Sequence, residues 1–488
     1  MNDEFINSLT SILSDRISFA EVVRSNYSKG EDVFDPVLPA AVVFPNSTEE
    51  VSSILKLCNQ YKVPVIPFGA GTSLEGQVVG IKEGIAMSME NMNKILEINP
   101  QDFDCKVQTY VTRIKLNDSL KDQGVFFPID PGADATIGGM CSTSASGTMA
   151  VKYGTMKTST IGLTVVLPTG EIITTGSRAK KTSSGYNLTN LFIGSEGTLG
   201  VITEIRLRLH PIPENIVSGI CHFNNLKEAV NTVKEIVQLG IQVARVELLN
   251  KDQMEISINF SNLKNLKITP TLFFEFHGSE KSNIESVNSV SELCDDNNGF
   301  DFDFSSDLKK RNELWKARHD VYWSVKSLKP NARVYATDAC VPITNLVECI
   351  KFAENEISKD GLRAPIVGHV GDGNFHVTIL YDPEIPEDMK KIREFSDKLV
   401  KKSLELGGTA TGEHGIGLEK RKLMTDLYSE NDLENMNWVR ECFNPESLLN
   451  PSKAIPTPGR CGESKRPVHI SDDVAASKMV ARKSGVAV

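Results

Sequence analysis

The sequence predicts a mixed fold of helices and strands, divided into two or three domains around a large core. The length of 488 residues allows that number of domains. Short apolar runs with strand character alternate with amphipathic helical periods along most of the chain. Three segments rich in Gly, Ser and Thr interrupt the first half, at residues 69–73, 131–147 and 194–200. They indicate ordered loops that have a function besides connecting secondary-structure elements.

The first elements follow the order strand, helix, strand and glycine-rich turn. Residues up to about 35 predict a helical lead-in, and residues 41–45 predict a short buried strand. Ser47 and Glu50 form a capping-box pattern, and the apolar residues after them recur at helical spacing. An apolar strand at 63–67 then runs into the first glycine-rich turn.

That turn, Gly69-Ala70-Gly71-Thr72-Ser73, is a candidate phosphate cradle. Glycines let backbone N–H groups approach an anion, and the hydroxyl groups add donors. Leu74 stands where the dinucleotide fingerprint has its third glycine, and the turn lacks the Lys of a P-loop. A nicotinamide-binding Rossmann domain and an NTPase are therefore poor fits, and a plain turn is the alternative.

The other two loops strengthen the cofactor interpretation. A flexible linker could have the composition of residues 131–147, but Ile137 and Met140 indicate an ordered, packed loop. The third loop leads into a strand at 201–209, in which apolar residues alternate with Arg206 and Arg208. Together the three loops predict a long, phosphate-bearing cofactor lying along them.

The second half alternates strands and helices and carries the histidine motifs. A domain boundary is predicted at the prolines near residue 213. We expect a strand at 271–276 and helices within 225–239 and 385–406. Turn residues at 444–451 close the folded part, and 457–488 is predicted to be a loosely ordered tail.

Three of the 8 histidines fall in two short runs, 368–376 and 412–415. If Asp372-Gly373 forms a two-residue type I′ turn, His369 lies directly opposite His376, with Cβ atoms roughly 5 Å apart. Two imidazoles on one face can share a divalent metal, for which Glu413 could supply a third ligand. His414 would then serve proton transfer. Ordinary structural histidines on a common hairpin are the alternative.

A predicted helix places Trp315, Arg318 and Tyr322 at i, i+3 and i+7, on one face. An arginine flanked by aromatic rings suits bidentate recognition of a carboxylate. The alternative, which the pattern alone favours, is an arginine that covers an apolar face or joins a surface ion pair.

Composition excludes several classes of protein. The 53 basic and 63 acidic residues give a net charge of −10, which disfavours nucleic-acid binding but leaves room for a local basic pocket. The 9 cysteines are scattered without a C-x-x-C pair, which indicates reduced thiols and argues against an iron–sulfur cluster or attached c-type haem. No apolar run reaches 18 residues, and the first residues are acidic. We therefore expect a cytoplasmic protein, with peripheral contact at the inner membrane as an alternative.

Six motifs in order carry a resemblance to a known family. They lie at residues 67–73, 131–153, 194–204, 368–376, 412–417 and 450–453. Their combination resembles the FAD-linked D-2-hydroxy-acid dehydrogenases of the vanillyl-alcohol-oxidase/p-cresol-methylhydroxylase (PCMH) superfamily, with cytochrome-type D-lactate dehydrogenases and glycolate oxidase D-subunits as the nearest branches. The resemblance covers about residues 35–456.

The resemblance implies an α+β fold, with a PCMH-type FAD-binding domain in two subdomains and a cap or substrate domain whose antiparallel sheet is covered by helices. The expected domains are a lead-in, the FAD-binding domain, the substrate domain, a segment returning to the FAD-binding domain and the tail, at 1–35, 36–213, 214–430, 431–456 and 457–488.

The resemblance also assigns roles to residues. FAD would contact Pro67, Gly69, Ala70, Gly71, Thr72, Ser73, Pro131, Gly132, Ile137, Gly138, Gly139, Ser142, Thr143, Ser146, Gly147, Glu196, Gly197, Val201, Ile202 and Asn450. Zinc or manganese would be bound by His369, His376 and Glu413, with His414 as the base. The substrate would contact Arg318, Tyr322, Trp323 and Asn374, with Arg318 binding its carboxylate.

Two departures from the family sharpen these expectations. Residues 69–77 contain no histidine, so FAD should be bound non-covalently. Ala336 stands where the hydroxyglutarate branch carries a lysine, which favours lactate or another monocarboxylate.

The expected reaction is the oxidation of a D-2-hydroxy acid, D-lactate above others, to the 2-keto acid. Electrons would pass to cytochrome c, a quinone or a partner subunit, and we expect a homo-oligomer. One alternative is a subunit of a glycolate-oxidising complex that is inactive alone. Another is a metal-dependent hydrolase, which would leave the three glycine-rich loops unexplained.

Overall fold

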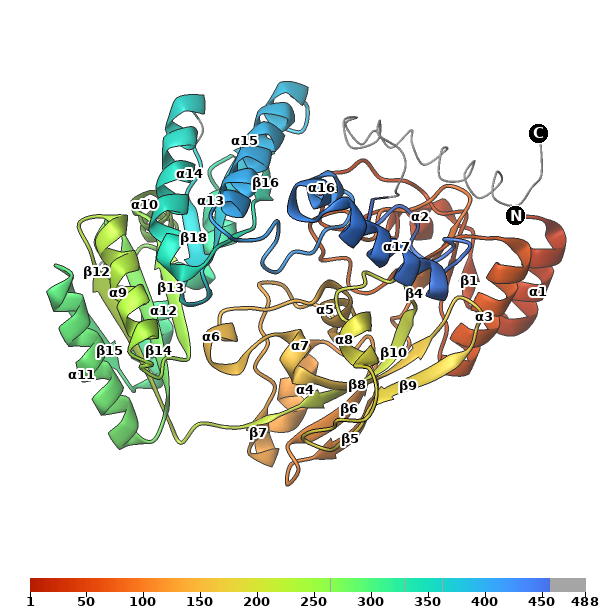
Figure 1. The fold of residues 1–488 in the computed structure, drawn as a ribbon, viewed down its shortest axis with the longest axis horizontal. Helices are drawn as coiled ribbons and strands as arrows, with labels where there is room; N and C mark the ends of the chain where they lie inside the picture. The colour runs from red at the N-terminus through yellow and green to blue at the C-terminus, as the bar shows by residue number, and fades with distance from the viewer. Residues whose placement is uncertain (264, 330, 362, 457–488) are drawn as a thin grey trace. The chain divides into compact units, whose positions relative to one another are not determined.

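The computed structural model describes residues 1–456 except 264, 330 and 362, so the predicted tail lies outside the described residues. The described chain forms two compact units (Figure 1). The first unit contains residues 1–146, 155–211 and the segment from 413 onward, and the second contains 147–154 and 212–412. The predicted boundary after residue 213 lies two residues beyond this division. The chain returns to the first unit at Glu413 rather than at 431.

The first unit begins with a four-stranded sheet in the order β1-β2-β4-β3. Its strands are β1 (Ile17–Ser18), β2 (Ala41–Val43), β3 (Val65–Phe68) and β4 (Ile85–Ser88). Strands β2, β4 and β3 run parallel, while β1 runs antiparallel to β2. The lead-in is therefore not purely helical: β1 separates α1 (Asp3–Leu13) from α2 (Glu21–Ser25), because it adds its backbone hydrogen bonds to the edge of β2.

Helix α3 (Thr48–Tyr61) connects β2 with β3, as predicted. The side chain of Ser47 accepts the N–H of Glu50 and begins the helix. The other half of the predicted capping box is not formed. The carboxylate of Glu50 instead accepts the N–H of Asn46 and pairs with Arg16 of the lead-in.

A second, antiparallel sheet has the order β5-β6-β10-β8-β9. In β10, Ile205 and Leu207 are buried while Arg206 and Arg208 are more exposed, so the predicted alternation is confirmed. Ile137 and Met140 join the apolar core under this sheet, which confirms that residues 131–147 form a packed loop rather than a linker. The strands are β5 (Ile95–Asn99), β6 (Asp104–Gln108), β8 (Thr160–Val166), β9 (Ile172–Gly176) and β10 (Val201–Arg208).

Short elements complete the first unit. They are α4 (Arg113–Leu120), η1 (Lys121–Gln123), β7 (Val125–Phe126), α5 (Ile137–Thr143), α7 (Met156–Ser159), α8 (Leu188–Phe192), β11 (His210–Pro211), η4 (Arg421–Leu423), α16 (Met424–Leu427) and α17 (Glu430–Phe443). The predicted closing turn follows α17, and Leu449 there bridges to Val65 of β3.

The second unit is built on one eight-stranded antiparallel sheet in the order β15-β12-β14-β13-β18-β19-β16, with β17 also pairing with β19. The predicted antiparallel sheet of the substrate domain is confirmed. Its strands are β12 (Asn215–His222), β13 (Arg245–Leu249), β14 (Thr271–Gly278), β15 (Phe300–Ser305), β16 (Arg333–Ala336), β17 (Ala339–Cys340), β18 (Ile366–His369) and β19 (Asn374–Tyr381).

Helices cover both faces of this sheet. Ile220 and Phe273 share an apolar cluster with Trp315 of α12, and Cys221, which points to the opposite face, contacts Cys294 of α11. The helices are α6 (Ala150–Tyr153), α9 (Leu226–Gln238), α10 (Lys251–Ser261), α11 (Glu280–Asp296), α12 (Leu308–His319), α13 (Val321–Lys326), η2 (Ile343–Asn345), α14 (Leu346–Asp360), η3 (Val370–Asp372) and α15 (Pro386–Glu405).

The histidine hairpin forms, but its predicted register is wrong. His369 pairs with Asn374, and His376 pairs with Val367. The chain turns through η3 and Gly373, whose φ of 75° places it in the left-handed region, so the turn is longer than two residues. The two histidines are therefore diagonal neighbours on one face, which preserves the inference that they lie close together.

The single helix predicted for Trp315, Arg318 and Tyr322 is also wrong. Asp320 lies between α12 and α13, and its carboxylate pairs with Lys316 of α12. Trp315 is buried and donates its Nε1–H to Ser218, whereas Tyr322 is exposed. The two aromatic rings do not share a face.

Two predictions about the whole chain can be compared with the described residues. Among them, no helix combines the length and apolar character that crossing a membrane requires. None of the cysteines at described positions forms a disulfide bond.

Candidate active site

In the first unit, the glycine-rich loops pack so closely that side chains would not fit. A Cβ at Gly69 would lie 2.5 Å from Oγ1 of Thr136, and one at Gly138 would overlap Thr109. The backbone N–H of Glu196 donates to the carbonyl of Ser142 over 2.8 Å. Strand β3, α5 and the loop before β10 therefore meet, although these segments are far apart in the sequence.

The same region contains buried polar atoms without a hydrogen-bond partner among the described residues. They are Oγ of Ser73, Oγ of Ser195 and Oδ1 of Asn450. The amide of Asn450 is oriented by two acceptors, because its Nδ2 donates to the carbonyls of Gln77 (2.9 Å) and Glu196 (2.6 Å). Buried polar atoms are nearly always paired, so three unpaired ones on predicted cofactor loops indicate a polar ligand.

Other predicted cofactor residues differ in their surroundings. A Cβ at Gly197 would lie 3.4 Å from Cγ of Pro67, so these two predicted cofactor residues are neighbours. Gly132 is exposed, and a Cβ there would meet nothing within 4 Å. Gly147 belongs to the second unit rather than to the first.

Also in the first unit, the loop that begins at Glu413 is held by hydrogen bonds to polar side chains. Oε2 of Glu413 accepts a hydrogen bond from Ser146 over 2.8 Å. Oε1 of Glu196 accepts the N–H of Ile416 over 2.6 Å, and burial raises the pKa of Glu196 to about 7. A Cβ at Gly415, whose φ is 82°, would lie 2.6 Å from that carboxylate, so only glycine fits.

The ring of His414 has a carboxylate partner that the sequence motifs did not reveal. Its Nδ1 lies 3.2 Å from Oε1 of Glu75, and Nζ of Lys420 lies 3.1 Å from the same oxygen. Glu75 and Lys420 are both buried. Glu75 stands two residues after the predicted phosphate loop, and a charged residue so close to such a loop was the available signal.

In the second unit, His369 and His376 form a buried pair whose ring centroids lie 5.3 Å apart. Nδ1 of His369 lies 2.8 Å from Oε1 of Glu247, and Nδ1 of His376 lies 2.8 Å from the carbonyl of Thr337. Both partners are acceptors, so each ring carries its proton on Nδ1 and its lone pair on Nε2. This is the arrangement typical of metal-binding histidines.

Glu247 joins two of the predicted site residues. Its Oε2 accepts a hydrogen bond from Nε of Arg318 over 2.7 Å, while its Oε1 binds His369. Burial by itself would raise the pKa of Glu247, but the neighbouring His369 and Arg318 hold it below its ordinary value. Sequence reasoning missed this residue, although a carboxylate inside the apolar strand β13 was a visible signal.

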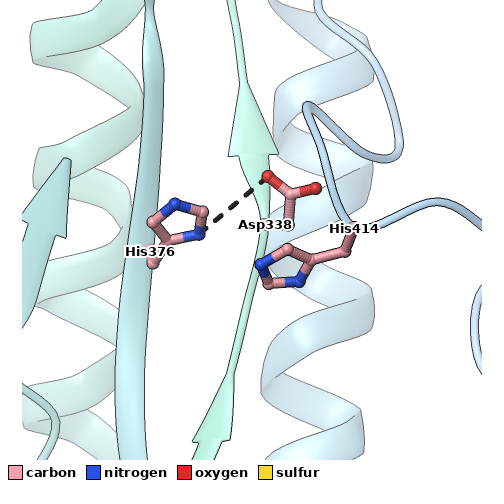
Figure 2. A group of neighbouring side chains, drawn as sticks. All are labelled: Asp338, His376 and His414. Atoms are coloured by element: carbon pink, nitrogen blue, oxygen red, sulfur yellow. Dashed lines mark ion pairs between the residues drawn. The ribbon is translucent and has the colours of Figure 1, made fainter. Parts of the chain in front are cut away.

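Asp338 organises the neighbouring side of the hairpin. Its Oδ1 accepts Nδ2 of Asn374 over 2.7 Å, and its Oδ2 accepts the N–H of Gly412 over 2.8 Å. Nδ1 of His376 lies 4.0 Å from Oδ1 of Asp338 (Figure 2). Asn374, predicted to contact substrate, also donates to the carbonyl of Ala339, so its buried Oδ1 is left without a partner among the described residues.

The two predicted aromatic substrate residues lie on the surface of the second unit. Tyr322 is 44% exposed and Trp323 is 59% exposed. Their rings contact each other edge to face, and Lys326 lies over both. Among the described residues, no hydrogen bond, ion pair or ring contact joins these two side chains to Arg318 or to the histidine pair.

Comparisons with known proteins place these features in a family. Residues 39–176 match the FAD binding domain, and residues 212–454 match the C-terminal domain of FAD linked oxidases. The protein is thus an oxidoreductase with an FAD-binding domain. The chain belongs to the family of FAD-linked 2-hydroxy-acid dehydrogenases, as the sequence motifs predicted.

Three relatives illustrate the range of the family. A probable mitochondrial D-lactate dehydrogenase of Danio rerio is 43% identical, with 93% of this chain and 92% of the relative aligned. A mitochondrial D-lactate dehydrogenase [cytochrome] of Arabidopsis thaliana is 41% identical over 93% of this chain and 80% of its own. The glycolate oxidase subunit GlcD of Bacillus subtilis is 30% identical over 85% of this chain and 89% of its own.

The solved structure of p-cresol methylhydroxylase shares the fold. It superposes with a TM-score of 0.77, covering 93% of this chain and 96% of its own at 16% identity. The predicted α+β fold with a PCMH-type FAD-binding domain is therefore confirmed.

Proposed function

We propose that this enzyme oxidises D-lactate to pyruvate with FAD and passes the electrons to cytochrome c. The observation that carries the proposal is the buried pair His369 and His376, oriented for metal binding within the domain typical of FAD-linked oxidases. The names of the relatives from Danio rerio and Arabidopsis thaliana support D-lactate, and the latter name supports cytochrome. A quinone or a partner subunit is the alternative acceptor.

The first unit fits FAD. The unpartnered polar atoms of Ser73, Ser195 and Asn450 would be satisfied by the cofactor, and Gly69 and Gly138 give the close packing that its loops need. Binding would be non-covalent, because residues 69–77 include no histidine. When bound, FAD supplies the acceptor for the hydride that leaves C2 of the substrate.

The residues of the histidine motifs and Arg318 would supply groups for a divalent metal, a substrate carboxylate and a proton. His369 and His376 would bind zinc or manganese through Nε2, with Glu413 as the third ligand, and such an ion would lower the pKa of the substrate hydroxyl. The guanidinium of Arg318 would hold the substrate carboxylate through its Nη groups while Nε stays bound to Glu247. His414 would accept the hydroxyl proton.

Glycolate oxidation is the second candidate, and the match to the glycolate oxidase subunit GlcD favours it. Glycolate, like lactate, is a monocarboxylate, which agrees with Ala336 in place of a second cationic side chain. In that case the chain would work within a larger complex.

An anaerobic bleaching experiment tests the proposal. The purified protein should be yellow, and D-lactate should bleach its flavin absorption faster than L-lactate, glycolate or D-2-hydroxyglutarate. Faster bleaching by glycolate would favour the second candidate. A yellow protein that none of these acids bleaches would contradict both.

His414→Ala tests the base. This variant should retain FAD and lose at least about a hundredfold in the rate of flavin reduction by D-lactate, in line with typical general-base contributions. His210→Ala, in β11 of the same unit, is the matched control and should reduce flavin normally. An unchanged rate in His414→Ala would rule out its role as base.

A further inference from the structure

We infer that Glu75 is a positioning residue that orients the imidazole of His414 for proton transfer, with Lys420 holding Glu75 in place. The inference rests on the proposed role of His414 as base. It concerns residues of the first unit only, on the segments that follow the predicted phosphate loop and Glu413.

The contact with Glu75 indicates which ring nitrogen of His414 carries the proton. Nδ1 lies 3.2 Å from Oε1 of Glu75, a carboxylate that is almost completely buried. A carboxylate accepts hydrogen bonds, so Nδ1 carries the proton of the neutral ring and donates it. The lone pair then lies on Nε2, and a base acting through Nε2 needs this tautomer.

Lys420 keeps the carboxylate of Glu75 in position. Its Nζ lies 3.1 Å from Oε1 of Glu75, and its side chain is as buried as that of Glu75. The ion pair therefore fixes the carboxylate oxygen of Glu75 that also lies beside Nδ1 of His414.

Hydrogen bonds also hold the backbone around Glu75 and His414. Gln77 accepts the N–H of Glu75 through Oε1 (3.0 Å) and donates through Nε2 to the carbonyl of His414 (2.7 Å). The carbonyl of Glu75 accepts the N–H groups of Leu418 (2.8 Å) and Glu419 (3.1 Å). Backbone and ring of His414 are thus fixed by one short segment, which leaves the imidazole little freedom to turn.

Glu75→Gln is the direct test in the FAD-loaded enzyme. The glutamine has nearly the same shape, but its amide can donate to the ring and select the wrong tautomer. We expect flavin reduction by D-lactate to slow by about ten- to a hundredfold, as for other residues that orient a functional histidine. The half-saturating D-lactate concentration should change less than about twofold, because the role inferred for Glu75 is in proton transfer and not in binding the substrate carboxylate.

Three further measurements separate positioning from general structural damage. FAD content should match the wild type, and the rate in D2O should fall more in Glu75→Gln than in the wild type, because proton transfer becomes limiting. In a His414→Ala background, Glu75→Gln should cause no additional loss. Glu50→Gln, which removes a carboxylate paired with Arg16 in the same unit, should behave as wild type.

The outcomes distinguish this inference from the proposed function. If D-lactate and the other acids fail to bleach the wild type, the proposed function fails and this inference with it. If the wild type is bleached and Glu75→Gln reduces flavin equally fast, only the positioning role is overturned. An equal further loss in the His414→Ala background also overturns it. If Glu75→Gln does not retain FAD, Glu75→Asp is the second variant, because it keeps the charge but moves the carboxylate away from the imidazole of His414. A normal rate of flavin reduction in Glu75→Asp would overturn the positioning role.

Discussion

At the scale of single residues, the second unit couples its predicted metal ligand to its predicted substrate anchor through one carboxylate. Glu247 binds Nδ1 of His369 with one oxygen and Nε of Arg318 with the other. Because Glu247 is completely buried, removal of Arg318 would leave its negative charge uncompensated in the interior. The orientation of Arg318 therefore depends on the same group that orients His369.

Arg318→Lys tests this arrangement. A lysine has a single ammonium group and cannot bind Glu247 and a substrate carboxylate in the same geometry as the guanidinium fork. We expect the KM for D-lactate to rise by about ten- to a hundredfold, the loss of one charged hydrogen bond. Steady-state kinetics would measure this, with Arg333→Lys at an exposed position of β16 as control. An unchanged KM would remove Arg318 from the binding site.

At the scale of elements, the second sheet of the first unit is joined across strands by a charged cluster. Asp104 of β6 is buried and accepts hydrogen bonds from Arg206 of β10 (2.8 Å) and from Arg178 (2.9 Å). Burial raises the pKa of Asp104, but Arg178, Asn99 and Arg206 outweigh it and hold that pKa below its ordinary value. The cluster ties β6 to β10 and to the segment after β9.

This shift predicts a specific pH dependence of stability. A carboxylate whose pKa is lower in the folded state stabilises fully above its unfolded pKa of about 4. That contribution is lost as pH falls through the folded pKa. Asp104→Asn should therefore lower the urea midpoint at pH 7, and its difference from wild type should shrink below about pH 4.

Asp102→Asn is the matched control for this experiment. Asp102 also pairs with Arg178, but it is exposed, so its removal should cost less than about 1 kcal/mol. Equal midpoints for wild type and Asp104→Asn at pH 7 would contradict the assignment.

At the scale of the whole molecule, the cofactor features and the histidine pair belong to different units. The unpartnered atoms on the cofactor loops are in the first unit, and His369 and His376 are in the second. The two family models divide the chain in a similar way. Binding of FAD and binding of a metal should therefore be separable.

Removal of the metal tests this separation. Dialysis against a chelator should abolish turnover of D-lactate while the flavin absorption stays, and added zinc or manganese should restore activity. Elemental analysis and absorption spectra of the same sample would measure both losses. Full turnover in verified metal-depleted protein would contradict a catalytic metal, and loss of FAD with the metal would contradict separable binding.

Many elements were predictable because they depend on local patterns. The buried strand before Pro45, helix α3 with its Ser47 cap and the alternation in β10 all follow from periodicity and capping. The proximity of His369 and His376 followed from a hairpin, even though its register was wrong. Side chains two apart on a strand share a face, so the diagonal pair survived the error.

The rest depended on contacts between segments far apart in the sequence. The break between α12 and α13 at Asp320, and the partners Glu75 and Glu247, involve residues that no local pattern connects to the site. A buried carboxylate acquires its role from the cation or imidazole that the fold brings to it. Its neighbours in the chain do not reveal that partner.

By itself, the sequence determined the family, the α+β class and the glycine-rich loops, because motifs and short periodicities depend only on residues that are close together in the chain. Only the tertiary structure decided how the histidines are held. It assigned Nδ1 of His369 to Glu247 and Nδ1 of His414 to Glu75, across 122 and 339 positions of the chain. Tautomer and orientation depend on such distant acceptors, and they come within hydrogen-bonding distance only when the chain has folded.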